Sequence, residues 1–99
     1  MKYQFQSTKT FNNWLTGLKD AVTKNKVLSR LDRVSNGNFG DYKSIDANLY
    51  ELRFNFGAGL RIYYTIRQGQ VVLLVAGGDK SSQQRDIEKA KSILKMLEN

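Results

Sequence analysis

The stretch from Leu49 to Lys80 constrains the fold more than any other part of the sequence. It contains three short runs of aromatic, aliphatic and β-branched residues, separated by turns that carry glycine. This pattern predicts a β-meander, in which antiparallel strands follow one another through tight turns. Apolar and polar residues alternate along the first two runs, so one sheet face is predicted to be a core and the other to be exposed and basic. The predicted core residues are Tyr50, Leu52, Phe54, Phe56, Leu60, Ile62, Tyr64 and Ile66.

The first turn predicts how the first two strands pair. A three-residue hairpin loop at 57–59, with the sequence Gly-Ala-Gly, sets Arg53 opposite Tyr63. Arg53 and Arg61 are then diagonal neighbours on the basic face, about 7–8 Å apart at Cα. This register therefore brings two arginines together.

The second turn adds a third cation to this pair. A two-residue turn at Gln68-Gly69 supplies the glycine that a positive φ favours, and it places Arg61 opposite Ala76. The third run then leaves the sheet through Gly-Gly-Asp-Lys, beside Arg61. Arg53, Arg61 and Lys80 are thus predicted to converge on one corner of the sheet.

Helical patterns flank the meander on both sides. Apolar residues spaced i, i+3, i+4 and i+7 follow N-cap candidates at 7–10 and predict a first helix. A second pattern runs from Asp20, which can cap or connect, to Gly37, a natural C-terminal cap. A third helix is expected from Ser81, which fits a capping box with Gln84. The apolar stripes are Phe11, Trp14, Leu15 and Leu18, then Val27, Leu28, Leu31 and Val34, then Ile87, Ala90, Leu94 and Leu97.

Together these elements predict an α+β fold in a single domain over residues 1–99. Two short strands are also expected, one at the edge of the sheet over 2–6 and one over 42–47 before the meander. The two N-terminal helices are predicted to form a hairpin that covers the core face of the meander, and the C-terminal helix comes last.

Composition limits the chemistry that this domain can perform. The sequence has no cysteine and no histidine, which excludes disulfides, zinc fingers, cysteine nucleophiles and Ser-His-Asp triads. Catalysis must then use Lys, Arg, Tyr or carboxylates, and no metal site or cofactor is predicted. Sixteen Lys and Arg against nine Asp and Glu give a net charge of +7, which favours a polyanion, an acidic protein or an anionic membrane as partner.

No segment of the sequence has the pattern of a targeting or membrane-spanning element. The first residues lack the apolar core of a signal peptide, and no apolar run approaches the length that crosses a bilayer. The sequence therefore predicts a soluble cytoplasmic protein.

Several short motifs, in this order and spacing, resemble the RelE/ParE superfamily of bacterial toxins, and within it the HigB-like addiction-module killer branch. The most specific is the block at 77–87 after the last strand. The motifs are Phe11-x-x-Trp14-Leu15-x-x-Leu18, Arg30-Leu31-x-Arg33, Gly37-Asn38-Phe39-Gly40-Asp41-x-Lys43, Glu51-Leu52-Arg53, Arg61-Ile62-Tyr63-Tyr64 and Gly77-Gly78-Asp79-Lys80-Ser81-Ser82-Gln83-x-x-Asp86-Ile87.

The resemblance implies a RelE-like fold and the toxin of a type II toxin–antitoxin module. It implies a cognate antitoxin encoded next door, of the helix-turn-helix type. In RelE-like members it also implies a metal-independent, ribosome-dependent endoribonuclease that inhibits translation by cleaving mRNA. In that reaction the ribose 2′-OH attacks the adjacent phosphate, and arginine suits the stabilisation of the resulting charge.

The resemblance also assigns roles to residues of this chain. Arg61 and Arg53 match basic residues that hold the scissile phosphate, and Lys80 matches one that binds or protonates it. Tyr63, expected on the open face, would stack on a base or donate a proton, or else only cover the sheet. Lys43 and Arg67 are predicted to bind RNA, with Arg67 the more distant.

Two departures from the RelE pattern keep other functions open. RelE-type proteins have a lysine pair before the position of Arg53, where this chain has Leu49 and Glu51, and no tyrosine stands early in the last helix. The alternative is a non-enzymatic, ParE-like toxin that poisons DNA gyrase by binding it. A third possibility is a basic nucleic-acid-binding module without toxicity.

A predicted apolar strip offers a place for the antitoxin. Val72, Leu74 and Ala76 are expected on the same face as the arginines, where an amphipathic, acidic segment could dock. The alternative is that the N-terminal strand or a loop covers this strip.

Overall fold

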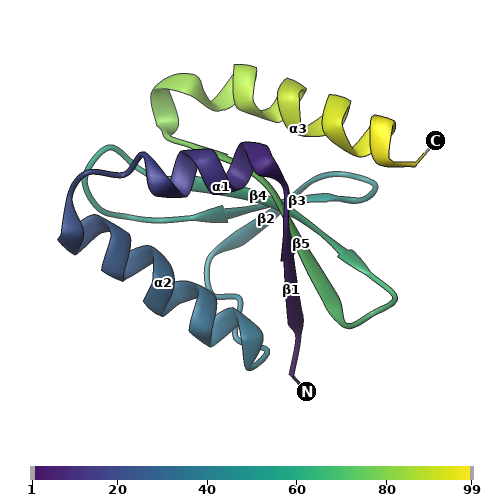
Figure 1. The fold of residues 1–99 in the computed structure, drawn as a ribbon, viewed down its shortest axis with the longest axis horizontal. Coiled ribbons are helices and arrows are strands. Elements are labelled where there is room, and N and C mark those ends of the chain that lie inside the picture. The colour runs from purple at the N-terminus through teal and green to yellow at the C-terminus, as the bar shows by residue number, and fades with distance from the viewer. Residues whose placement is uncertain (1, 99) are drawn as a thin grey trace.

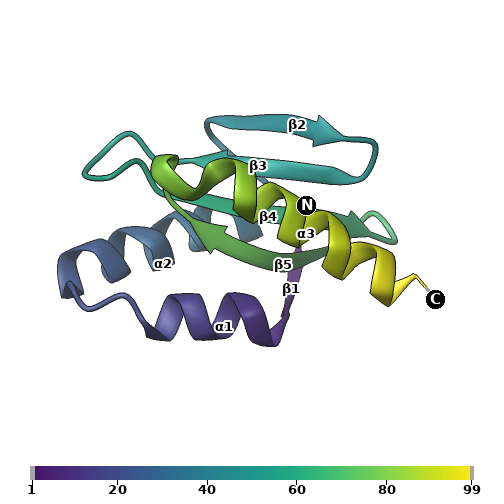
Figure 2. The same ribbon diagram turned by 90° about the horizontal axis from the view of Figure 1, so that it is seen from above.

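The structure, a computed structural model, describes residues 2–98 and has an α+β fold, as predicted. Five strands form one sheet in the order β1-β5-β4-β3-β2. Helices α1 and α2 lie on one face of the sheet and α3 lies on the other (Figures 1 and 2). The strands are β1 (Gln4–Ser7), β2 (Tyr42–Asp46), β3 (Leu49–Arg53), β4 (Arg61–Arg67) and β5 (Val71–Gly78), and the helices are α1 (Lys9–Thr16), α2 (Ala21–Ser35), a 3-10 turn (Lys80–Ser82) and α3 (Gln83–Leu97).

Side-chain caps explain where the first two helices begin. Thr8 accepts a hydrogen bond from the backbone N–H of Phe11 at 3.0 Å and caps α1. Asp20 accepts one from Val22 N–H at 3.2 Å and caps α2. Each cap satisfies an N–H group that has no partner inside its helix. Both predicted helix starts are confirmed.

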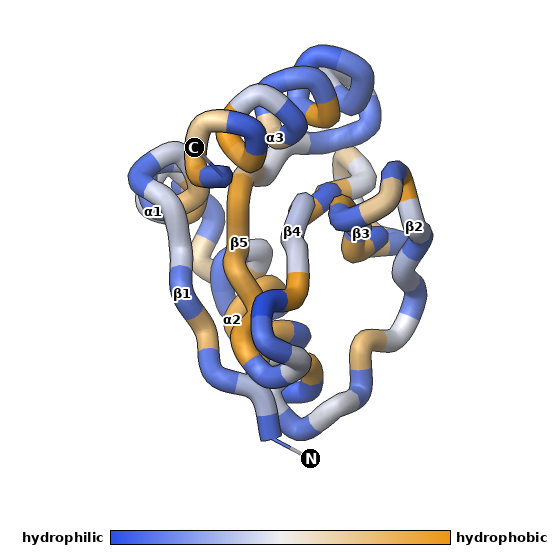
Figure 3. Tube along the Cα trace, turned by 90° about the vertical axis from the view of Figure 1, so that its right-hand side faces the viewer, coloured by the Kyte–Doolittle hydropathy of each residue, from blue (hydrophilic) through white to orange (hydrophobic). Residues whose placement is uncertain are grey.

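The predicted core face is confirmed as the main core of the protein. Apolar side chains of α1 and α2 pack there on the alternating residues of the strands. Figure 3 shows β5 as a nearly continuous hydrophobic strand between its neighbours β1 and β4. The buried members of this core are Phe11, Val27, Leu31, Val34, Leu52, Phe54, Leu60, Ile62, Tyr64, Val72 and Leu74.

The opposite face is a second core, so the prediction of an open basic face is wrong. Ala90 of α3 is fully buried against this face, with Ile87 and Leu94 packed beside it. Tyr63 is 0% exposed and Arg61 only 3%. The physical reason is the apolar stripe of α3, which must be buried and has only this face of the sheet available.

Strands β3 and β4 pair in a different register from the predicted one. Arg53 lies directly opposite Arg61, because the ladder ends sooner and the connecting loop is longer than three residues. Phe54 N–H still donates to Leu60 C=O at 3.1 Å, which closes the base of this loop. The observed register brings Arg53 and Arg61 closer together than the predicted diagonal arrangement would.

The turn between β4 and β5 lies at Gln68-Gly69 as predicted, but the prediction of a two-residue turn is wrong, because Arg67 pairs with Val71 and leaves a three-residue loop. Gln68 and Gly69 both have positive φ angles, of 55° and 71°. The longer turn shifts the register by one residue, and a bulge between Tyr63 and Tyr64 shifts it by one more, so Arg61 lies opposite Gly78 instead of Ala76. A shift of one residue in a strand moves its side chains to the other face of the sheet.

This shift removes the predicted apolar strip beside the arginines. Val72 and Leu74 belong to the main core, and the bulge returns Ala76 to the second core. All three are buried, with at most 4% exposure. The expectation that they form an open docking surface for an antitoxin is therefore wrong.

The two edges of the sheet are the short strands predicted from the sequence. β1 pairs with β5 in parallel, and β2 pairs with β3 in antiparallel orientation. The start of α3 differs from the prediction, because Asp79 and Ser82 form the capping box and Ser81 does not cap the helix. Within residues 2–98, every helix is too short or too polar to cross a bilayer.

Candidate anion-binding site

The structure brings Arg53, Arg61 and Lys80 together at the loop between β3 and β4, which we call the basic corner. Arg53 and Arg61 are direct cross-strand partners. Lys80 begins the 3-10 turn after β5, and its N–H donates to Ala58 C=O in the loop at 3.4 Å. Figures 1 and 2 show this loop between the start of α3 and the N-terminus of α2.

Gly59 explains how Lys80 and Arg61 approach each other. A Cβ atom added there would lie 3.0 Å from Lys80 Cγ and Cδ and 3.6 Å from Arg61 Nη1. Gly59 also has a φ of 73°, a conformation that costs other residues roughly 1–2 kcal/mol. The loop therefore needs glycine here both for its backbone and for the two cationic side chains packed against it.

A buried carboxylate lies at the centre of the basic corner. Glu51 is 0% exposed, and its Oε1 is 3.5 Å from Arg53 Nε and 3.8 Å from Arg61 Nε. Its Oε2 accepts a hydrogen bond of 2.8 Å from Gln83 Nε2 in α3. The motif Glu51-Leu52-Arg53 and the absence of a lysine at this position did not predict that Glu51 is buried between the two arginines. Glu51 stands two residues before Arg53, so the period of a strand places both side chains on one face, and this spacing was the sequence signal for their ion pair.

The two arginines differ in how much solvent reaches them. Arg61 is buried, and its Nη1 donates to the carbonyls of Gly59 and Leu60 at 3.2 and 3.1 Å. The side chain of Arg53 is 36% exposed, and Lys80 is exposed. An anion arriving from solvent would therefore contact Arg53 and Lys80, while Arg61 adds a fixed charge behind them.

Tyr63 does not occupy the exposed position that the sequence predicted. Its hydroxyl is buried beside Glu51 and makes no hydrogen bond to any other of the residues 2–98. Burial, and next the negative charge of Glu51, raise the pKa of Tyr63 well above its ordinary value. Tyr63 therefore cannot stack on a base from the solvent side.

Lys43 and Arg67 lie at different distances from the basic corner. Lys43 is exposed on the edge strand β2 and is the cross-strand partner of Glu51, so it lies on the same face as the corner. Arg67 ends β4 at the opposite end from Arg61, roughly 20 Å away along the strand. The structure thus brings Lys43 near the corner and leaves Arg67 remote.

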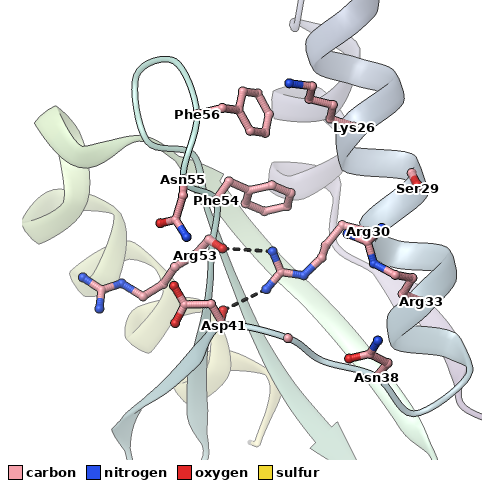
Figure 4. A pocket seen from close by; sticks show the side chains of 11 residues that line it. Lys26, Ser29, Arg30, Arg33, Asn38, Asp41, Arg53, Phe54, Asn55 and Phe56 are labelled. Carbon is pink, nitrogen blue, oxygen red and sulfur yellow. Dashed lines mark hydrogen bonds between the residues drawn. The ribbon is translucent and has the colours of Figure 1, made fainter.

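Arg30 of α2 is a structural residue of this region whose position the sequence analysis did not predict. It is 8% exposed and donates to the carbonyls of Phe39, Asp41 and Arg53 at 2.8–3.2 Å. Figure 4 shows the bonds to Asp41 and Arg53. Its guanidinium also stands over the Phe54 ring, 4.9 Å from the centroid. Burial, and next the charge of nearby Arg33, lower the pKa of Arg30. Arg30 therefore holds the end of β3, whose last residue is Arg53.

Comparison with known proteins places this site in context. Residues 13–98 match the family model described as phage derived protein Gp49-like. An uncharacterized protein of Haemophilus influenzae is 42% identical over 97 residues, which covers 98% of each chain.

Solved structures show the same fold at low identity. A free-state mutant of the Escherichia coli toxin RelE matches with a TM-score of 0.68 and 14% identity, over 90% of this chain and 98% of that one. An archaeal RelE–RelB complex from Pyrococcus horikoshii contains a chain that matches with a TM-score of 0.61 and 15% identity, over 81% of this chain and 97% of that one. The fold is therefore RelE-like.

Proposed function

This chain belongs to the Gp49-like family of phage-derived proteins and has a RelE-like fold, and from this premise we propose that it is the toxin of a type II toxin–antitoxin module. We propose further that it cleaves mRNA on the ribosome and so inhibits translation. Its partner would be a cognate antitoxin of the helix-turn-helix type, and it would act in the cytoplasm. The finer assignment to the HigB-like branch is part of this proposal.

The observation that carries the nuclease proposal is the convergence of three cations at the basic corner. Arg53 and Arg61 are direct partners, and Lys80 shares the packing against Gly59. Cations fixed in this way stabilise the charge that develops on a phosphorane. Arg61 does not have to reorganise during the reaction, since it is held by Glu51 and by two backbone carbonyls.

The proposed reaction is an intramolecular transfer at phosphorus. The 2′-OH gives its proton to solvent water as its oxygen forms a bond to phosphorus, while the bond from phosphorus to the 5′ oxygen breaks, leaving a 2′,3′-cyclic phosphate and a 5′-hydroxyl end. Arg53 would bind the non-bridging oxygens, and Arg61 would support the charge. The exposed Lys80 would give its proton to the departing 5′ oxygen. Lys43 would hold the adjoining RNA, with Arg67 contacting it further away.

One observation favours the alternative, a toxin that poisons DNA gyrase by binding. The buried carboxylate of Glu51 lies within 3.8 Å of both arginines and partly neutralises them. A surface that recognises a protein tolerates such pairing better than a site that must stabilise a new negative charge.

Mapping of RNA 5′ ends after brief induction in bacteria tests the proposal. The nuclease predicts new cuts within translated messages, and Arg53→Ala should abolish them. Lys95→Ala, a charge change at an exposed position of α3, should leave the cuts in place. Growth arrest with intact messages and double-strand DNA breaks would instead support the gyrase poison.

A further inference from the structure

A second cationic site lies beside the basic corner, in a hollow between α2, the loop at 38–41 and the loop at 54–56 (Figure 4). Its volume is about 420 Å³. Pockets of roughly 300–1,000 Å³ are typical of small-ligand sites. We call it the α2 hollow, and it is lined by Lys26, Ser29, Arg30, Arg33, Asn38, Gly40, Asp41, Arg53, Phe54, Asn55 and Phe56.

Three cations of α2 face this hollow from one stripe of the helix. Lys26, Arg30 and Arg33 are spaced i, i+4 and i+7, so they lie above one another along the helix. None of them forms an ion pair with another of the residues 2–98. Like charges at this spacing destabilise a helix unless an anion lies between them. The one acidic residue of the lining is Asp41.

The charge at the base of the hollow is held in place. Arg30 is nearly buried, and its donors are engaged by the carbonyls of Phe39, Asp41 and Arg53. Arg30 therefore cannot move into solvent to increase its distance from Lys26 and Arg33, as an exposed arginine would. Lys26 and Arg33 are exposed and free to contact a ligand that enters the hollow.

The α2 hollow and the basic corner flank the same loop. Arg30 binds the carbonyl of Arg53, whose guanidinium belongs to the corner. Asn55 and Phe56 line the hollow and belong to the same loop as Gly59, against which Lys80 packs. A strand that crosses this loop would meet both cationic sites in succession.

We propose that the α2 hollow is a phosphate subsite for single-stranded RNA, next to the scissile phosphate at the basic corner. This inference rests on the proposed nuclease function and deepens it. Lys26 and Arg33 contact the phosphate, Arg30 supplies fixed charge behind it, and the amides of Asn38 and Asn55 are placed to hydrogen-bond a sugar or base edge.

The lining favours RNA over an acidic protein segment. An amphipathic helix would need an apolar groove, but only two of the lining residues, Phe54 and Phe56, have apolar side chains. Phe54 is 4% exposed, and the Phe56 ring is covered by Lys26 Nζ at 4.2 Å from its centroid. Little apolar surface therefore remains for a helix to bury.

Fluorescence anisotropy with a labelled, 2′-O-methylated RNA tetranucleotide tests the subsite, because this probe cannot be cleaved. Lys26→Ala and Arg33→Ala should each weaken binding by about two- to fivefold, as expected for one exposed charge pair. Each should also make the slope of log K against log salt shallower by about 0.7, the value for one lost phosphate contact on a single strand.

Lys24→Ala is the matched control, since it removes the same charge from the same helix outside the hollow. It should leave both affinity and salt slope unchanged. The proposal is overturned if the wild-type protein does not bind the probe, if both hollow variants bind it as the wild type does, or if Lys24→Ala weakens binding equally. It is also overturned if an octaglutamate peptide binds with the same sensitivity to the variants and the RNA does not.

The RNA-end mapping separates this inference from the proposed function. Binding that depends on Lys26 and Arg33, together with intact cellular messages, would support the subsite and refute the nuclease. Cuts in messages, together with normal RNA binding by both hollow variants, would support the nuclease and refute the subsite.

Discussion

Replacement of Glu51 by glutamine isolates the charge of the buried carboxylate from its shape. Glutamine has the same length, and its carbonyl can still accept the hydrogen bond from Gln83 Nε2. The variant therefore loses the attraction to Arg53 and Arg61, and its amide NH2 takes the place of Oε1 beside them. The structure predicts opposite effects on stability and on RNA binding.

The expected loss of stability follows from the surroundings of the two arginines. Removal of one partner from a buried ion pair costs about 3–5 kcal/mol, because the other charge stays buried. The cost is lower here because Arg53 is 36% exposed and Arg61 Nη1 already donates to two carbonyls. The separations from Glu51, 3.5 and 3.8 Å, also exceed the ~2.8 Å of a close charged hydrogen bond. We expect a loss of about 2 kcal/mol, or about 8–16 °C in Tm for a domain of this size.

Thermal unfolding followed by circular dichroism measures this loss, and Glu88→Gln, on an exposed residue of α3, is the control. The same variant should bind the RNA tetranucleotide more tightly than the wild type, since Arg53 is released toward solvent. An unchanged Tm would refute the idea that Glu51 holds the two arginines. Weaker RNA binding by the folded variant would refute the idea that its charge opposes an anion there.

Other substitutions test neighbouring parts of the structure. Gly59→Ala should lower stability by more than Gly57→Ala. Both positions have positive φ, but only at position 59 would an added Cβ contact packed side chains. Chemical denaturation of both variants measures the difference, and equal losses of stability would contradict the packing at Gly59. Arg30→Ala should cost about 3 kcal/mol or more, since it leaves buried carbonyls without donors, whereas exposed Arg33→Ala should change stability by less than about 0.5 kcal/mol. Stability should fall above about pH 10, because the unfolded chain loses the Tyr63 phenol proton while the folded chain, with its raised pKa, retains it. Tyr63→Phe should make that alkaline slope shallower by about 1.4 kcal/mol per pH unit, and an unchanged slope in urea titrations would contradict the buried, protonated hydroxyl.

The parts of the fold that depend on local chemistry could be predicted from the sequence. Thr8 and Asp20 are N-cap residues that predict where α1 and α2 begin. The alternation of apolar and polar residues around Leu52 and Ile62 predicts the main core. The position of the turn at Gln68-Gly69 was also predictable, because glycine favours the positive φ that Gly69 adopts. Each of these features is decided within a few residues of the chain.

The parts that depend on distant contacts could not be predicted. The alternation predicts that Tyr63 is exposed, but α3 packs over it. Tertiary contacts decide which face of the sheet α3 covers. The length of the turn after Arg67 decides which face Val72 and Leu74 occupy, and the bulge after Tyr63, which has no local signal, decides the face of Ala76. The convergence of Arg61 with Lys80 was nevertheless predicted, because both follow from where the strands end.

The parallel pairing of β1 with β5 determines the order in which the protein can be assembled during its own synthesis. Thr8 Oγ1 donates to Val75 C=O across 67 residues, whereas β2 to β5 pair as consecutive strands. The hairpins can form as the chain emerges, but the first strand has no partner until the last strand is made. Lys80 follows that strand, so the basic corner is also incomplete until residue 80 of 99 has been added. The nascent protein therefore carries a complete site only after β5 and the turn that follows it have been synthesised.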